Sequence, residues 1–151
     1  MDWTLFLPVL YAFVACIGFG GLYNLHGRPM LAAAVGGALG WLVYLLVFRV
    51  ALAPDLVAGF ASAAAVAFYA EVLARVQKKT VTTYLLPGII PMVPGAGIYY
   101  TMEFCIRGDT ANFITEGLHT LGMAGSLAIG ILVVDSTWRM IRLMQRKAEK
   151  V

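Results

Sequence analysis

Charged side chains are scarce in this sequence. Only 13% of its 151 residues are Asp, Glu, Lys or Arg, whereas 61% are hydrophobic and the mean hydropathy is +0.83. Soluble globular proteins carry about 25% charged residues, which keep their surfaces polar. A water-soluble domain is therefore excluded, and we expect a lipid bilayer to cover most of the molecule.

Cysteine is also rare, and the amino terminus lacks a basic leader. The two cysteines, Cys16 and Cys105, stand far apart, so no disulfide framework is indicated. No Lys or Arg precedes the first apolar run, which favours a retained span over a cleaved signal peptide. Five of the eleven basic residues lie in the last thirteen positions. Such a cluster is typical of a membrane topology signal, and we do not expect nucleic-acid binding.

Motifs for catalysis or cofactor binding are missing too. The sequence has no zinc-protease, serine-hydrolase or P-loop motif. Glu116 and His119 have a Glu-x-x-His spacing, but di-metal bundles use two copies with further glutamates, and this chain has one. We therefore predict no enzyme, no ATP-driven pump, no cofactor and no metal site.

Long apolar runs are abundant. A hydrocarbon core of about 30 Å is crossed by about 20 apolar helical residues. Five runs qualify or nearly qualify, which predicts an all-α integral membrane protein with one transmembrane domain over residues 1–151. The predicted spans are 5–23, 30–48, 56–73, 84–102 and 118–138, and the longest predicted loop is 103–117.

The charges between these runs predict an orientation. If all five runs cross, nine of the eleven basic residues fall on one side, in the first and third loops and the tail. The positive-inside rule then places the amino terminus outside and the carboxyl terminus in the cytoplasm. A re-entrant fourth run would separate the basic third loop from the basic tail, so the pattern favours a full crossing.

Small residues recur at four-residue spacing in three of the runs. Such stripes let membrane helices approach closely, so they predict a packed bundle. The stripes are Ala32, Gly36 and Gly40; Gly59, Ala63 and Ala67; and Gly122, Ser126 and Gly130.

The fourth run cannot be one straight helix. It holds three prolines and three glycines within eleven residues, and each proline removes a backbone N–H that a helix would use. An unpaired backbone group in hydrocarbon costs several kcal/mol, so this segment must be buried in protein or line a wet cavity. Transporters build binding sites from such broken spans, although a kink that only shapes the bundle is the alternative. The six residues are Pro87, Gly88, Pro91, Pro94, Gly95 and Gly97.

The same segment resembles the proline-glycine signature of the threonine/serine exporter family. The similar residues are Ile90-Pro91-Met92-Val93-Pro94-Gly95, followed by Tyr99 and Met102. Two further stretches agree with the resemblance, one from Gly18-Phe19 to Tyr23-Asn24 and one over Ala70-Glu71-Val72-Leu73-Ala74-Arg75 with Lys78. The chain is most similar to the separate small subunit that corresponds to the carboxyl-terminal half of the fused exporters.

The resemblance implies a multi-pass protein of the bacterial inner membrane that exports small hydrophilic metabolites. Its substrates would be threonine and serine, or dicarboxylates such as succinate, and its partner a larger membrane subunit of the same family. A scaffold that stabilises this partner and a channel-forming homo-oligomer are the alternatives. We expect the substrate near Pro91, Pro94, Gly95, Gly97, Tyr99 and Tyr100. Asn24 is a candidate for a further contact, and helix capping or packing is the alternative for this residue.

Acidic residues in or beside the spans are candidates for ion coupling. Glu71 has Arg75 four residues later, which also suits a local ion pair that anchors the helix end. Asp135 lies near the inner end of the last span, where an acid is either functional or paired with Arg139. Glu103, beside the fourth run, is the third candidate.

Overall fold

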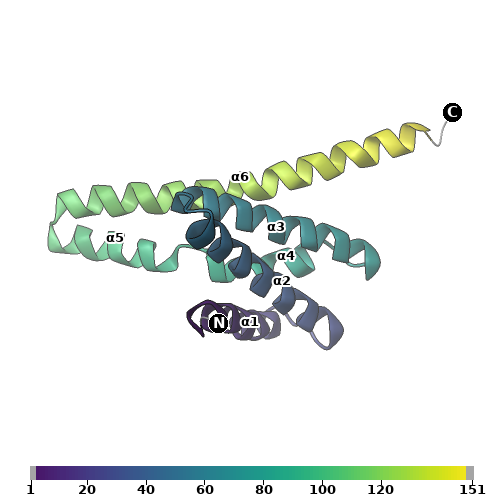
Figure 1. Cartoon of the computed structure of the whole chain (residues 1–151), viewed down its shortest axis with the longest axis horizontal. Helices are drawn as coiled ribbons and strands as arrows, with labels where there is room; N and C mark the ends of the chain where they lie inside the picture. The colour runs from purple at the N-terminus through teal and green to yellow at the C-terminus, as the bar shows by residue number, and fades with distance from the viewer. Residues whose placement is uncertain (1–2, 149–151) are drawn as a thin grey trace.

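A computed structural model describes residues 3–148, and every regular element in that range is a helix. Lys150, one of the basic residues counted in the charge pattern, lies outside the described residues. Figure 1 shows an elongated bundle with a long carboxyl-terminal helix. The elements are α1 (Trp3–Leu22), α2 (Arg28–Leu45) with a π-helical turn η1 (Leu46–Val50), α3 (Asp55–Val76), α4 (Thr82–Ile89), a 3-10 turn η2 (Ile90–Met92), α5 (Gly95–Arg107) and α6 (Thr110–Ala148).

Three of these helical stretches are long and apolar enough to cross a membrane: Arg28–Val50, Asp55–Val76 and Thr110–Met144. The pair Thr82–Met92 and Gly95–Arg107 makes a fourth if it forms one bent span. The apolar helix Phe6–Leu22 is shorter. Large apolar side chains remain exposed along all of them, and bilayer lipid is the solvent that such a surface requires.

The predicted loop 103–117 is wrong, because the chain there is almost entirely helical. α5 runs to Arg107 and α6 starts at Thr110, so α5 and α6 form a helical hairpin that projects at the left of Figure 1. Gly108 makes the turn with φ 72°, a backbone conformation that glycine adopts without strain. Asp109 then caps α6 by accepting a hydrogen bond from the backbone N–H of Asn112 at 3.2 Å. The charged residues of this stretch therefore lie on a helical hairpin that also exposes apolar side chains.

The fourth run is broken as predicted, and the two parts meet at 49°. Pro91 leaves the carbonyl of Pro87 without its helical partner, and the buried Cys16 thiol of α1 donates to this oxygen at 3.0 Å. The carbonyl of Ile90 accepts from the N–H of Val93 at 3.1 Å. The carbonyls of Pro87 and Ile90 are thus re-paired within the protein, as an apolar environment demands, while Val93, Gly95 and Ala96 remain exposed.

The small-residue stripes lie at close helix contacts. A Cβ at Gly40 of α2 would stand 2.4 Å from Val66 of α3, and one at Gly130 of α6 would stand 2.6 Å from the backbone oxygen of Phe60. Gly59 of α3 faces the Ser126 hydroxyl in the same way, at 2.9 Å. Even alanine would force these helices apart, so the glycines set the spacing of α2, α3 and α6.

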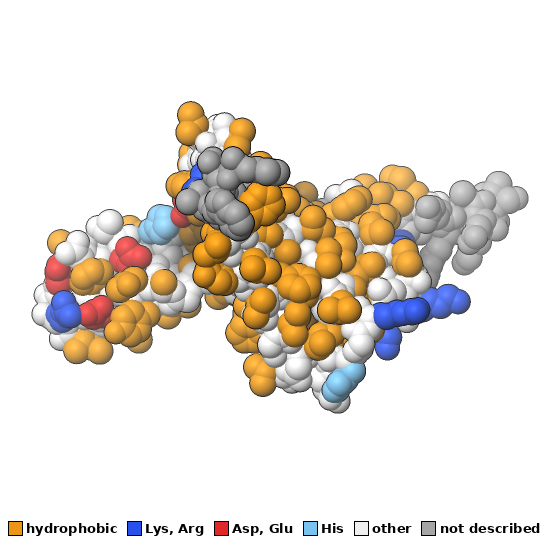
Figure 2. Space-filling model, turned by 60° about the horizontal axis from the view of Figure 1, so that its bottom comes forward, with side chains coloured by type: hydrophobic (Ala, Val, Ile, Leu, Met, Phe, Trp, Pro, Cys, Tyr) orange, Lys and Arg blue, Asp and Glu red, His pale blue; other side chains and the backbone are white. Residues whose placement is uncertain are grey.

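Charge is divided between the two ends of the bundle (Figure 2). On the face shown, acidic side chains gather on the α5–α6 hairpin, where Arg107 pairs with Glu103, and most of the basic side chains in view lie at the opposite end. We call these the acidic end and the basic end. The acidic end carries Glu103, Asp109 and Glu116, and the basic end carries Arg75, Lys78, Lys79, Arg139 and Arg142.

Candidate functional site

A cavity of about 290 Å³ lies at the break in the fourth run. α2 and α3 contribute one part of its lining, which we call the α2–α3 wall, and the break and α6 contribute the rest. α3 and α6 meet at the cavity, where a Cβ at Gly59 would stand 3.2 Å from Met123. The break brings the backbone close to the cavity because Pro94 and Gly95 end one helical piece and begin the next. Its lining residues are Trp41, Tyr44, Gly59, Ser62, Pro91, Met92, Val93, Pro94, Gly95, Ala96, Met123 and Leu127.

The α2 wall is aromatic. The Trp41 ring stacks on Tyr44 with centroids 5.4 Å apart, and Tyr44 stacks on Phe48 at 5.8 Å. These residues follow one another at helical spacing along α2 and η1. They form an aromatic ladder that runs from the cavity toward the acidic end.

The start of α5 supplies hydrogen-bond donors beside the cavity. No side chain caps this helix. The first helical hydrogen bond of α5 runs from the N–H of Ile98 to the carbonyl of Pro94, at 3.1 Å. The N–H groups of Ala96 and Gly97 have no partner among the hydrogen bonds of the described residues. Because a helix amino terminus also carries partial positive charge, this end of α5 suits an anionic group.

Two side chains near the same helix start have buried polar atoms without a partner. These atoms are Nε1 of Trp41 and Oγ1 of Thr120. Thr120 is buried, and its hydroxyl would be 2.3 Å from a Cβ at Gly97, so it lies against the first turn of α5. Buried polar atoms are normally paired, and an exception indicates an unfilled role such as ligand binding. Together these groups offer several donors to one acceptor-rich ligand.

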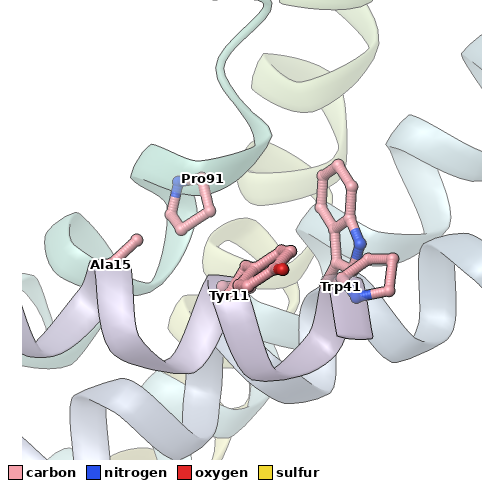
Figure 3. Close-up of a pocket in the computed structure, with 6 residues that line it drawn as sticks. Tyr11, Ala15, Trp41 and Pro91 are labelled. Carbon is pink, nitrogen blue, oxygen red and sulfur yellow. The ribbon is translucent and has the colours of Figure 1, made fainter. Parts of the chain in front are cut away.

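A second cavity, of about 310 Å³, opens between α1 and the other side of the break. Figure 3 shows Tyr11 and Ala15 of α1 on one side, with Pro91 and Trp41 opposite. Trp41 and Pro91 line both cavities, so they form the partition between them.

The structure brings together only some of the predicted substrate residues. Pro91, Pro94 and Gly95 line the first cavity, whereas Gly97 lies against Thr120 and neither of these two residues is part of the lining. Tyr99 and Tyr100 instead form an exposed edge-to-face pair on α5, with ring centroids 5.5 Å apart.

Asn24 is separated from the cavity. It has φ 56° in the turn after α1, where its carbonyl faces Nδ1 of His26 at 3.0 Å. The next residue, Leu25, packs with Ala70 and Ala74 near the basic end of α3. The position therefore suits the alternative of helix capping rather than a contact with substrate at the break.

The three acidic candidates are all paired with an arginine four residues later. Glu71 is buried and lies 2.8 Å from Arg75, whereas the partly exposed Glu103 lies 2.5 Å from Arg107. Asp135 is half-exposed and stands 3.7 Å from Arg139. Glu71 is the exception in having a second arginine, Arg142 of α6, at 3.6 Å. Neither Glu71 oxygen receives an aligned hydrogen bond, so this pairing is mainly electrostatic.

One polar cluster was not predicted from the sequence. Tyr44 donates a hydrogen bond to Oδ1 of Asp55, and Oδ2 of Asp55 lies 3.1 Å from Nε2 of His119. The three residues come from α2, α3 and α6, and Tyr44 also lines the cavity. His119 is paired with an acid of another helix rather than with Glu116. Residues 3–148 hold no group of three or more side chains that could bind a metal ion together. Sequence spacing gave no signal for contacts between residues so far apart.

Comparison with known proteins supplies the remaining evidence. Searches among curated proteins and among solved structures find no match. The family model described as "Threonine/Serine exporter, ThrE" matches residues 8–137, which is most of the chain and includes the whole broken segment. The resemblance noted in the sequence is therefore confirmed, and this chain belongs to the threonine/serine exporter family.

Proposed function

We propose that this chain is a membrane subunit of a secondary exporter for small hydrophilic metabolites that carry a carboxylate. Threonine, serine and dicarboxylates such as succinate are the substrate candidates. Membership of the exporter family supports transport rather than catalysis. The cavity at the break is the proposed substrate site, with Pro91, Pro94, Gly95 and Gly97 from the expected set and Trp41 and Thr120 added to it.

The observation that carries this proposal is a set of unpaired donors, of which Trp41 and Ala96 line the cavity and Gly97 and Thr120 adjoin it at the first turn of α5. Trp41 Nε1 can only donate, the N–H groups of Ala96 and Gly97 can only donate, and Thr120 Oγ1 can do so. A carboxylate offers about four acceptor positions on two oxygens. It would satisfy these groups together and meet the positive end of α5. The aromatic and aliphatic walls would then exclude water from the bound ligand.

The proposed topology has five crossings, with the amino terminus outside and the carboxyl terminus in the cytoplasm of a bacterium. α1 and the bent α4–α5 pair would each cross once beside the three longer helices. The basic end then faces the cytoplasm and the acidic end faces outward, as the positive-inside rule requires.

A larger membrane subunit of the same family is the proposed partner. Within the described chain, α6 is the only element that packs extensively against α5. Apolar side chains such as Ile98, Met102 and Ile106 stay exposed on the hairpin. A partner bundle against this face would supply the missing wall of a transport path.

The test is efflux of labelled threonine and labelled succinate from cells that express this chain, the larger subunit or both. Efflux that requires both chains supports the proposal and identifies the substrate class. Efflux from the larger subunit alone would assign this chain a scaffold role, and efflux from this chain alone would indicate a homo-oligomeric pore.

A variant pair ties the result to the cavity. Gly95→Leu should abolish efflux without reducing the amount of chain in the membrane, because it fills the cavity at the break. Gly125→Leu is the matched control, since the Cβ position of either glycine has no atom within 4 Å but Gly125 does not line the cavity. Normal efflux by Gly95→Leu would remove the site assignment.

A further inference from the structure

The Tyr44–Asp55–His119 cluster links the α2–α3 wall to α6 beside the cavity. Tyr44 lines the cavity, Asp55 begins α3, and His119 precedes the cavity residue Met123 by four residues on α6. α3 and α6 also pack directly next to the cluster, where a Cβ at Gly122 would stand 3.2 Å from Leu56. The cluster therefore adds a polar contact to this packing at the side of the cavity where Tyr44 lies.

The chemistry of the cluster depends on one proton. The Asp55 carboxylate accepts the Tyr44 hydroxyl on one oxygen and faces the His119 imidazole with the other. A neutral imidazole offers a single hydrogen bond here, whereas a protonated one adds an ion pair across the 3.1 Å contact. Histidine is the side chain that ordinarily gains and loses its proton between about pH 5 and 8.

The surroundings make this proton exchangeable with the outside solution. The His119 side chain is 52% exposed, and Nδ1 is left free when Nε2 faces Asp55. Each element packed nearby brings charged or titratable groups, and η1, which packs against α3, carries Arg49. α3 presents Asp55, α2 presents Tyr44, and Glu116 precedes His119 by one turn on α6. α5 carries Tyr99, Tyr100 and Glu103, the last of which is ion-paired with Arg107.

We propose that Tyr44, Asp55 and His119 form a proton-binding latch that holds the outer mouth of the substrate cavity closed. A proton from the outside solution binds Nδ1 of His119 and converts the hydrogen bond to Asp55 into an ion pair. The link between the α2–α3 wall and α6 then tightens, and release of substrate outward slows. Loss of the proton weakens the link. This inference rests on the proposed export function, and it adds control by external pH.

The test uses right-side-out membrane vesicles that contain both subunits and are loaded with labelled threonine or labelled succinate. The internal pH is held near neutral, and release is measured while the external pH is varied between about 5 and 8. Release from the wild type should fall roughly fivefold on acidification, the change that a half-exposed ion pair of ordinary strength can produce. His119→Gln and Asp55→Asn should release at the fast, alkaline rate throughout. Glu116→Gln, one turn away on the same helix, should keep the wild-type response.

The outcomes separate the latch from the transport function. A wild type that releases label at a rate independent of pH overturns the latch but leaves the export function standing. The same holds if His119→Gln keeps the full pH response, or if both latch variants reach the membrane normally and release nothing. A wild type that releases neither label at any pH overturns the export function, and the latch with it.

Discussion

Arg142 of α6 lies 3.6 Å from Glu71 of α3, from Nη2 to Oε1, and so joins these two helices near the basic end. Glu71 is the only fully buried charged side chain among the described residues. Its other oxygen lies 2.8 Å from Arg75, whose guanidinium covers the Trp138 ring at 4.1 Å from the centroid. The carboxylate is therefore buried only because two cations from different helices compensate it.

Removing a cation should harm the protein more than removing the carboxylate charge. Arg75→Leu leaves a buried carboxylate that is poorly compensated, and we expect a loss of about 2 kcal/mol in unfolding free energy. Glu71→Gln should cost less, because the arginines left behind are partly exposed to solvent.

The double variant Arg75→Leu with Glu71→Gln isolates the charge effect. It should be more stable in detergent thermal unfolding than Arg75→Leu alone, since no buried charge remains. If adding Glu71→Gln brings no recovery, the loss comes from the Trp138 contact. The same Glu71→Gln chain in the efflux assay tests ion coupling, and unchanged efflux would assign Glu71 a structural role.

Trp41→Phe separates stability from substrate binding. The indole Nε1 is buried without a partner, so its removal should leave the unfolding free energy unchanged or slightly higher. A hydrogen bond to a charged ligand is worth about 1.5–3 kcal/mol, so the apparent affinity for exported substrate should fall about tenfold or more. Concentration-dependent efflux measures this. Equal affinity in the two chains would show that Nε1 does not contact substrate.

Gly97→Ala should disturb the start of α5 because its Cβ would stand 2.3 Å from the Thr120 hydroxyl. Such overpacking costs about 1–3 kcal/mol. Thr120→Ala removes the clashing atom, so the double variant Gly97→Ala with Thr120→Ala should regain stability. If the Thr120 hydroxyl binds substrate, the double variant should still not transport. Gly95→Ala is the control, because no atom lies within 4 Å of its Cβ position. Thermal unfolding in detergent compares the wild type, Gly97→Ala, the double variant and Gly95→Ala.

Cys105 reports the orientation of the hairpin. It is exposed on α5, whereas Cys16 is buried, so a maleimide reagent should modify only Cys105 in the folded chain. In the proposed topology a membrane-impermeant maleimide added to intact cells reaches it. Cys105→Ser should abolish the labelling. Labelling that appears only after the cells are opened would reverse the orientation.

Asp109 should hold the first turn of α6 over the whole physiological pH range. Hydrogen bonds from the Asn112 side chain and backbone lower the pKa of this carboxyl below its ordinary value of 3.8. A lowered pKa means that the cap stabilises the fold above pH 3.8, and that this contribution is lost as the pH falls through the lower, folded-state pKa. Amide hydrogen exchange at 110–112 should therefore be slow at neutral pH and fast in Asp109→Ala. Equal exchange in the two chains would show that the cap contributes nothing.

The sequence predicted the apolar helices, the broken fourth run and the close contacts of glycine, because each depends on local patterns. It did not predict the α5–α6 hairpin, since Glu103, Asp109 and Glu116 interrupt the apolar pattern and were interpreted as a loop. The Asp55–His119 contact was equally hidden. Contacts of that kind depend on how helices pack, which composition and spacing do not encode.

Two charged contacts tie α6 to the same neighbour. His119 meets Asp55 at the start of α3, and Arg142 meets Glu71 near its end, about 35 Å further along α6 at 1.5 Å per residue. If the outer contact opens while the inner one holds, a tilt of α6 by about 5° moves His119 by about 3 Å at this helical rise. Such a tilt must also loosen the glycine contacts of α6 with α3, at Gly122 beside Leu56 and at Gly59 beside Ser126. These glycines would therefore act as the hinge brake that limits how far α6 can swing.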